Sequence, residues 1–256
     1  MNIDLDLPDF AESAFWSRKI RESQWPPDPV GSALKVSDIF SGCGGLTMGT
    51  LLAAHALNRS ISIELAVDSW SSAMDVYSEN FGHLTKKLIC GDVKKVMKSF
   101  KICDLDVVVA GPPCQGHSDL NNSTRRIDER NELYIFPASF AIKHSARILL
   151  IENVPAVVHS AQKVVSRAEK KLIKAGYVTA QIVVDTSNFG IPQKRKRHLL
   201  IGSKSHDSKN LFAITDRILS YRSSPKVMDF IDDLEDFYDN SELLMRISKV
   251  NRSRID

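Results

Sequence analysis

A single thiol stands at the point where a buried strand is expected to end. Residues 106–110 form an apolar run that predicts a buried parallel strand, and Gly111-Pro112-Pro113-Cys114-Gln115 follows it directly. In an open α/β sheet, chemistry takes place where the carboxyl ends of strands meet their loops. The two prolines would hold Cys114 rigidly where a substrate can reach it. A lone cysteine in a turn is more often simply buried, so the rest of the chain has to decide.

A glutamate ends a second apolar strand. Glu152 follows four apolar residues, 148–151, and a carboxyl group there is costly unless it leaves the core. In a doubly wound sheet it would lie beside the strand end that leads to Cys114. Desolvation there would raise its pKa, which suits a carboxyl group that must donate a proton. Taken alone, Glu152 is equally well explained as the partner of a nearby arginine.

A basic run precedes the last predicted strand. Alternation in an extended segment sends Gln193, Arg195 and Arg197 to one side of the chain. A planar guanidinium on that side can hold a phosphate or a substrate carbonyl. A solvated basic surface is the alternative interpretation.

Glycines and two acids at three further strand ends predict a nucleoside pocket. Asp38-Ile39-Phe40-Ser41-Gly42-Cys43-Gly44-Gly45 lies between a strand and its helix, where glycines let backbone N–H groups approach a ligand. Asp68 ends the second strand, where an acid would bind ribose hydroxyls. Gly91-Asp92-Val93 follows the third strand. Either acid alone is better explained as a helix N-cap. The chain has no Walker lysine, so ATP cleavage is not expected.

The composition is that of an ordinary globular protein. The 256 residues carry a net charge of +3, and the four cysteines show neither CxxC spacing nor a histidine at metal-ligand spacing. We therefore expect a reducing, cytoplasmic location and no metal site. No stretch reaches the roughly 18 apolar residues of a membrane span, and the acidic N-terminus does not resemble a secretory signal.

Strands alternate with helices along the middle of the chain. This alternation predicts a doubly wound, mostly parallel α/β sheet, with the last two strands as an antiparallel pair at one end. The predicted strands are residues 34–40, 61–68, 87–90, 105–110, 148–152, 177–185 and 197–202, and the predicted helices are residues 46–58, 71–81, 93–99, 133–145 and 160–175.

These strand-end motifs, in this order, resemble those of the cytosine-C5 DNA methyltransferase family. The similarity runs from about Lys35 to Gly202 and implies a Rossmann-like fold that uses S-adenosylmethionine. The similar segments are residues 38–45, Asp68 with Val76-Tyr77-Ser78-Glu79-Asn80-Phe81, Gly91-Asp92-Val93, residues 111–118, Glu152-Asn153-Val154 and residues 188–197.

The resemblance implies covalent catalysis on a cytosine flipped out of duplex DNA. Cys114, as thiolate, would add to C6 of the base. Glu152, protonated, would donate a hydrogen bond to N3, and Arg195 would hold the base's carbonyl. C5 would then take the methyl group, a base would remove the C5 proton, and Cys114 would be eliminated.

The resemblance also assigns residues to the cofactor and to DNA. Phe40 would pack near the cofactor, Asp68 would bind its ribose and Asp92 its adenine amino group, with Trp70 as a candidate adenine cover. The full predicted cofactor set is Asp38, Phe40, Ser41, Gly42, Cys43, Gly44, Gly45, Asp68, Ser69, Asp92, Val93 and Pro112. The predicted substrate and DNA contacts are Gln115, Ser118, Arg125, Arg126 and Arg197. Arg125 and Arg126 would contact phosphates from a loop that closes over the flipped base, with an ordinary exposed loop as the alternative, and Arg197 is structural or phosphate-facing.

The flanking segments are expected to be separate from the catalytic domain at residues 35–205. Residues 1–34 read as an appendage with a Pro-rich linker, and residues 206–256 as an extension with an acidic amphipathic helix that is solvated or docks a partner. No target-recognition domain and no Gly-Asn-rich final motif follow Gly202. We expect the catalytic subunit of a split or partner-dependent enzyme. The alternatives are a compact divergent enzyme, a tRNA methyltransferase, or a non-catalytic subunit that binds DNA or the cofactor.

Overall fold

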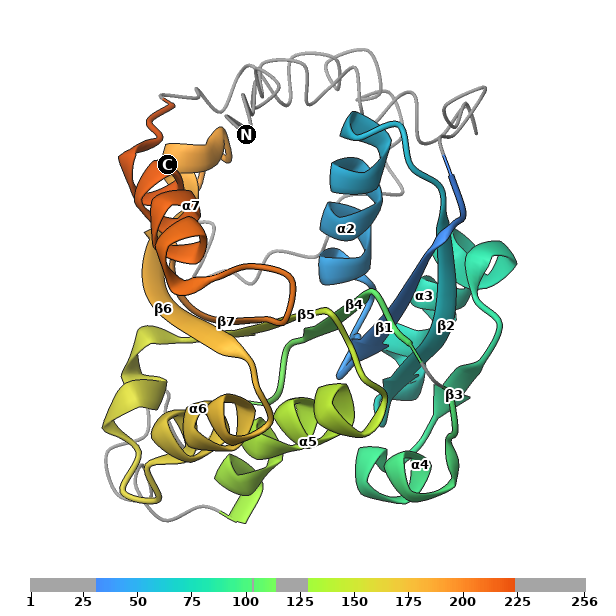
Figure 1. The fold of residues 1–256 in the computed structure, drawn as a ribbon. Coiled ribbons are helices and arrows are strands. Elements are labelled where there is room, and N and C mark those ends of the chain that lie inside the picture. The colour runs from blue at the N-terminus through green and yellow to red at the C-terminus, as the bar shows by residue number, and fades with distance from the viewer. Residues whose placement is uncertain (1–30, 103, 114–128, 224–256) are drawn as a thin grey trace, which may run out of the picture.

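The computed structural model describes residues 31–102, 104–113 and 129–223, and these form one seven-stranded sheet covered by helices on both faces (Figure 1). The strand order is β3-β2-β1-β4-β5-β7-β6. Its members are β1 (Leu34–Ile39), β2 (Ile61–Asp68), β3 (Leu88–Cys90), β4 (Val107–Ala110), β5 (Ile148–Asn153), β6 (Val178–Asp185) and β7 (Lys196–Ser203).

The pairing of the strands confirms the predicted fold class. β3, β2, β1, β4 and β5 pair in parallel, whereas β7 runs antiparallel to both β5 and β6. The carboxyl ends of β1, β2, β4 and β5 therefore share one edge, as expected when each crossover between neighbouring parallel strands is made by a helix. This edge carries the glycine turn, Asp68 and Glu152.

Six α-helices connect these strands or follow them within the described residues. In Figure 1, α5 and α6 lie on one face of the sheet, and α2 lies on the other. The helices are α2 (Gly45–Ala56), α3 (Ser71–Phe81), α4 (Val93–Ser99), α5 (Phe136–Lys143), α6 (Val164–Lys174) and α7 (Ser208–Ser220). Short 3₁₀ turns are η2 (Gly82–Leu84), η3 (Glu129–Ile135), η4 (Pro155–His159) and η5 (Thr186–Phe189).

Three helical segments differ from the prediction. The helix expected from residue 133 begins as η3, and α5 starts only at Phe136, with Pro137 in its first turn, where proline is tolerated. The helix expected from residue 160 starts at Val164, after Lys163 in the left-handed conformation. Helix α7 was not predicted, although Asp207 caps it by accepting from Asn210 N at 2.8 Å.

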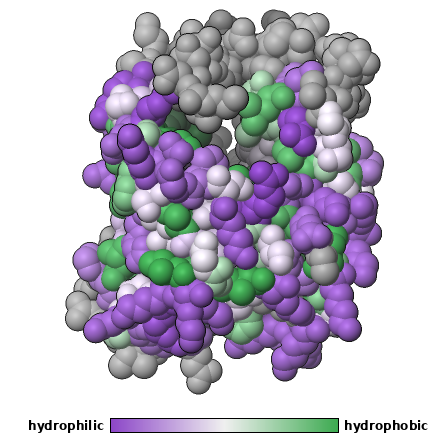
Figure 2. Space-filling view, in the orientation of Figure 1, coloured by the Kyte–Doolittle hydropathy of each residue, from purple (hydrophilic) through white to green (hydrophobic). Residues whose placement is uncertain are grey.

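Each face of the sheet has its own hydrophobic core. The larger core joins the sheet to α4, α5 and α6, and the smaller one joins β2 to α2 and α3. The face of the molecule in Figure 2 is mainly hydrophilic with separated apolar areas. Within the described residues, no helix combines the length and apolar character that crossing a membrane requires.

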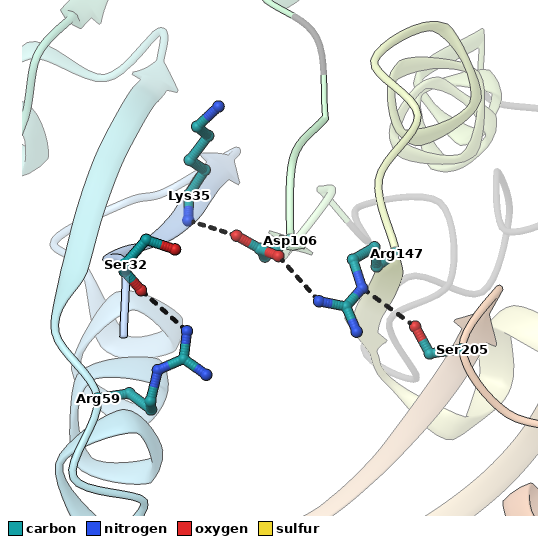
Figure 3. A network of polar contacts seen from close by, with 6 residues as sticks. All are labelled: Ser32, Lys35, Arg59, Asp106, Arg147 and Ser205. Carbon is teal, nitrogen blue, oxygen red and sulfur yellow. Dashed lines mark hydrogen bonds and ion pairs between the residues drawn. The ribbon is translucent and has the colours of Figure 1, made fainter. Parts of the chain in front are cut away.

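A polar network ties together the amino ends of the central strands (Figure 3). Asp106, just before β4, accepts from Lys35 N at 2.9 Å and from the Arg147 guanidinium at 3.3 Å. Arg147 also donates to Ser205 Oγ at 3.3 Å. These contacts are exposed and each contributes little to stability. They join the chain near β1, β4, β5 and β7 at the edge opposite the predicted site, which helps fix the strands on which that site is built.

Candidate functional site

The loop between β1 and α2 runs over the end of β2. Phe40 N and Ser41 N both donate to Val67 O, at 2.9 and 3.1 Å, and Gly42 N donates to Asp68 Oδ2 at 2.9 Å. Phe40, Gly42 and Gly44 have φ angles of 62°, 52° and 96°. The left-handed conformation is costly for a non-glycine residue such as Phe40, so this loop has a strained and specific shape.

Gly44 is required by its neighbours. A Cβ atom at this position would lie 2.3 Å from Phe81 Cε2, and its φ angle also disfavours any other residue. Gly44 is the N-cap of α2 and has no side chain to cap the helix. The N-terminus of α2 therefore has no side-chain cap, although the backbone N–H of Thr47 in its first turn is hydrogen-bonded to Asp38. The positive end of the helix favours anions.

Asp68 holds the loop at the end of β2. Its Oδ2 accepts from Gly42 N and its Oδ1 accepts from Trp70 N, each at 2.9 Å. The N-cap of α3 is Trp70, so Asp68 is not simply a capping residue. Its oxygens have further lone pairs for a ligand. Trp70 is 68% exposed, and Ser69 is also exposed.

Asp38 lies beneath the loop rather than on its surface. It is fully buried, and its Oδ2 accepts from Thr47 Oγ1 at 2.7 Å. Burial raises the pKa of Asp38 to about 7, against the lowering effect of the Thr47 hydrogen bond, and the negative charge of Asp68 raises it further. Within the described residues, Asp38 Oδ1 has no hydrogen-bond partner.

Asp92 is a helix N-cap, which was the alternative interpretation of this residue. It is the N-cap of α4, and its side chain accepts from Lys94 N at 2.8 Å. Gly91 N donates to Asp68 O at 2.8 Å, so the third strand end adjoins the second. Val93 is buried. The remaining loop residues divide by exposure, with Ser41 and Gly44 buried and Cys43 and Gly45 exposed.

Glu152 contacts Arg197 on the neighbouring strand. In the antiparallel pairing Glu152 lies opposite Leu199, two residues from Arg197, so both side chains share one face. Arg197 Nε forms an ion pair with Glu152 Oε1, and the two side chains are 15% and 29% exposed. Burial raises the pKa of Glu152, and the positive charge of Arg195 acts in the opposite direction. Arg195 itself is exposed.

The turn after β4 is anchored to the end of β5. Ala110 pairs with Ile151, and a Cβ atom on Gly111 would lie 3.8 Å from Glu152 Oε2. Asn153 Nδ2 donates to Pro112 O at 3.1 Å. Asn153 was missed as a site residue, although its place directly after Glu152 was the available signal. The predicted nucleophile and DNA contacts fall outside the described residues; these are Cys114, Gln115, Ser118, Arg125 and Arg126.

Lys196, next to Arg197 in the chain, belongs to a different surface. It lines a hollow of about 230 Å³ between the end of β6 and α7, together with Asp185, Phe189 and Arg222. Lys196 and Asp185 are also paired in register. Alternation along β7 thus sends Arg197 toward Glu152 and Lys196 toward this hollow.

Comparison with known proteins identifies the family of the chain. Residues 34–254 match the family model described as C-5 cytosine-specific DNA methylase. The chain is 32% identical over 219 residues to Type II methyltransferase M1.BsuMI of Bacillus subtilis, covering 79% of this chain and 51% of that protein. It is 29% identical over 190 residues to Type II methyltransferase M.HgiDI of Herpetosiphon aurantiacus, covering 74% of this chain and 59% of that protein.

A solved structure has the same fold. The crystal structure of the S. pombe Dnmt2 methyltransferase superposes with a TM-score of 0.51 at 21% identity, covering 82% of this chain and 57% of that one. The chain spans about half the length of the curated relatives it matches. The family match covers most of the chain, including the strand ends described above, and the chain belongs to the C-5 cytosine-specific DNA methylase family.

Proposed function

We propose that this chain carries the catalytic site of a DNA cytosine-C5 methyltransferase. One observation carries the proposal within the family. Glu152 lies beside the β4 end that leads to Cys114, with its Oε2 3.8 Å from the Cβ position of Gly111. A nucleophile and a proton donor on adjoining strand ends can act on opposite parts of one pyrimidine ring.

The β1–α2 loop is proposed to bind S-adenosylmethionine. The residues present fit this ligand, because Gly44 leaves the N-terminus of α2 without a side-chain cap, Asp68 offers acceptors for ribose hydroxyls and Trp70 is an exposed aromatic residue two positions after Asp68. When bound, this cofactor supplies the methyl group from its sulfonium. Cys43, Ser69, Asp92 and Pro112 stay predictions as further contacts.

Covalent catalysis is proposed to proceed through Cys114. Its thiolate forms a bond to C6 of cytosine while Glu152 donates a hydrogen bond to N3, so that C5 becomes nucleophilic and accepts the methyl group. A base then removes the C5 proton, and the Cys114–C6 bond breaks to restore the ring. Burial, which raises the pKa of Glu152, acts in favour of the protonated form that this step requires.

Arg197 is proposed to hold Glu152 in place. The ion pair favours the ionised carboxylate, whereas burial favours the protonated form. Arg195, exposed on the same side of the chain by alternation, remains the predicted ligand of the base's carbonyl. The geometry thus supports a division of roles in which Arg197 orients the acid and Arg195 meets the substrate.

A trapping experiment tests the proposed reaction. The full chain is incubated with S-adenosylmethionine and duplex DNA containing 5-fluorocytosine, whose C5 fluorine cannot be removed as a proton. We expect an adduct that survives denaturation, which Cys114→Ser abolishes and Cys90→Ser, at an exposed free cysteine, leaves intact. An adduct on matched tRNA only would favour the tRNA alternative. No adduct on either substrate, even when an extract of the native cells is added to supply a partner, would favour a non-catalytic subunit.

Target recognition by a second protein stays a prediction. Affinity purification of the tagged full chain from its native cells, followed by mass spectrometry, tests it. A stoichiometric partner that carries a Gly-Asn-rich motif would support the split enzyme. Sequence-specific methylation by the chain alone would contradict it.

A further inference from the structure

Helix α3 contributes buried side chains beneath the β1–α2 loop. Tyr77 and Phe81 belong to the family-like segment Val76–Phe81. Both are buried, at 0% and 4% exposed. Their rings meet edge to face, with centroids 5.1 Å apart. Their role in the proposed cofactor site must therefore be indirect.

A hydrogen-bonded chain connects α3 to the base of the loop. Thr47 Oγ1 donates to Asp38 Oδ2 at 2.7 Å, and the Tyr77 hydroxyl lies 2.9 Å from Thr47 Oγ1. Because the Thr47 hydroxyl has a single proton, Tyr77 must donate to Thr47 whenever Thr47 donates to Asp38. This chain crosses from α3 through α2 to the end of β1, two residues before Phe40.

Phe81 supports the same loop by packing. Its ring fills the space where Gly44 would carry a Cβ atom. The loop is thus supported from below at two points, at Asp38 just before it and at Gly44, under which Phe81 packs. Such support is needed because left-handed residues at Phe40, Gly42 and Gly44 persist only where the surroundings fix them.

Burying the hydrogen-bonded chain of Tyr77, Thr47 and Asp38 in the core costs free energy. A buried carboxyl group with an unpartnered Oδ1 costs free energy that an apolar residue of similar size would not. Its compensating property is direction, since hydrogen bonds fix the relative placement of three elements more narrowly than apolar packing does.

We propose that Asp38, Thr47 and Tyr77 are positioning residues that hold the β1–α2 loop in the shape that receives the cofactor, with Phe81 as the matching apolar support. This inference rests on the proposed function, because it concerns the same cofactor loop. It places the family-like segment Val76–Phe81 on the underside of the site.

Two substitutions at Thr47 separate this role from ordinary core packing. Thr47→Val keeps the side-chain volume and removes the hydroxyl, whereas Thr47→Ser keeps the hydroxyl and removes a methyl group. We expect Thr47→Val to weaken S-adenosylmethionine binding roughly fivefold, measured by calorimetry, and to speed amide hydrogen exchange in residues 40–46 by a similar factor. Thr47→Ser should leave both within about twofold of the unmodified chain, although it loses more packing.

Tyr77→Phe supplies a second test in case Thr47→Val does not fold. It keeps the ring packing and removes the hydroxyl that contacts Thr47 and Thr85. Cofactor affinity and loop exchange should change in the same direction as in Thr47→Val, by a smaller factor. The inference is overturned if Thr47→Val and Tyr77→Phe leave loop exchange unchanged, or if Thr47→Ser weakens binding as much as Thr47→Val. If the unmodified chain binds no S-adenosylmethionine, the proposed function fails, while the exchange rates still decide the positioning role.

Discussion

Replacing Asp38 by asparagine is predicted to remove a pH-dependent loss of stability. The pKa of this buried carboxyl is raised from its ordinary value of 3.8 to about 7, first by burial. Between these two values the folded protein holds a proton that the unfolded chain has released, so the free energy of unfolding falls as pH rises. Each pKa unit corresponds to about 1.4 kcal/mol, which gives a total loss of about 4 kcal/mol by pH 8.

Asp38→Asn keeps an oxygen that can accept from Thr47 but cannot ionise. The new amide also places two N–H donors where Asp38 Oδ1 has no partner among the described residues, at a pH-independent cost of about 1–3 kcal/mol. The variant should therefore be the less stable protein at pH 4 and equal or more stable at pH 8. Between pH 4 and pH 8, the difference in free energy of unfolding between the variant and the unmodified chain should change by about 4 kcal/mol, and this change is the quantity to measure.

Urea unfolding at several pH values from 4 to 9, followed by circular dichroism, gives this difference. Asp75→Asn, at an exposed aspartate of α3, is the matched control and should change stability by less than about 0.5 kcal/mol throughout. Parallel curves for Asp38→Asn and the unmodified chain across the whole range would refute the reasoning, because they would show that Asp38 does not titrate differently in the folded and unfolded states.

Further substitutions probe the site at Gly44, Arg197 and Asn153. Gly44→Ala should destabilise the protein by about 1–3 kcal/mol and abolish cofactor binding. Adding Phe81→Leu should restore only part of the stability and of the cofactor affinity, because the strain of the positive φ angle remains. Thermal unfolding measures the stability and calorimetry measures the affinity. Arg197→Met should shift the alkaline fall of the pH–rate profile upward, since the ion pair no longer favours ionised Glu152, and Arg197→Lys should shift it less. Asn153→Ala should lower the rate of methyl transfer with unchanged cofactor affinity, because it releases the turn after β4; an equal loss of both would contradict this role.

Much of the fold follows from local sequence signals. The bounds of β2, α3 and α4 agree with the prediction, because each is flanked by a clear change from apolar strand to polar turn. The parallel order follows from helices that separate the strands. The starts of α5 and α6 were less predictable, since Pro137 and the left-handed Lys163 act through backbone geometry that the apolar periodicity does not reveal.

The sequence predicted which strand ends form the site, but it did not predict which side chains contact one another there. Alternation placed Arg195 and Arg197 on one side, yet only the register of β5 with β7, which sets Glu152 opposite Leu199, decides that Arg197 makes the ion pair. In the same way, Asp38 was predicted as a cofactor contact, whereas in the structure it is buried and hydrogen-bonded to Thr47. Thr47 in turn contacts Tyr77, and these two residues come from two helices that the sequence does not show to be adjacent.

Gly111 lies between the two halves of the proposed site. Its N–H donates to Ile39 O at 3.3 Å, which joins the turn after β4 to the start of the cofactor loop. A Cβ atom there would lie 3.7 Å from Phe40 O and 3.8 Å from Glu152 Oε2. The strained loop and the acid therefore approach the same glycine from opposite sides. Because β1, β4 and β5 are adjacent, strand order alone would bring the methyl donor proposed for the loop within reach of the base that Glu152 is proposed to hold.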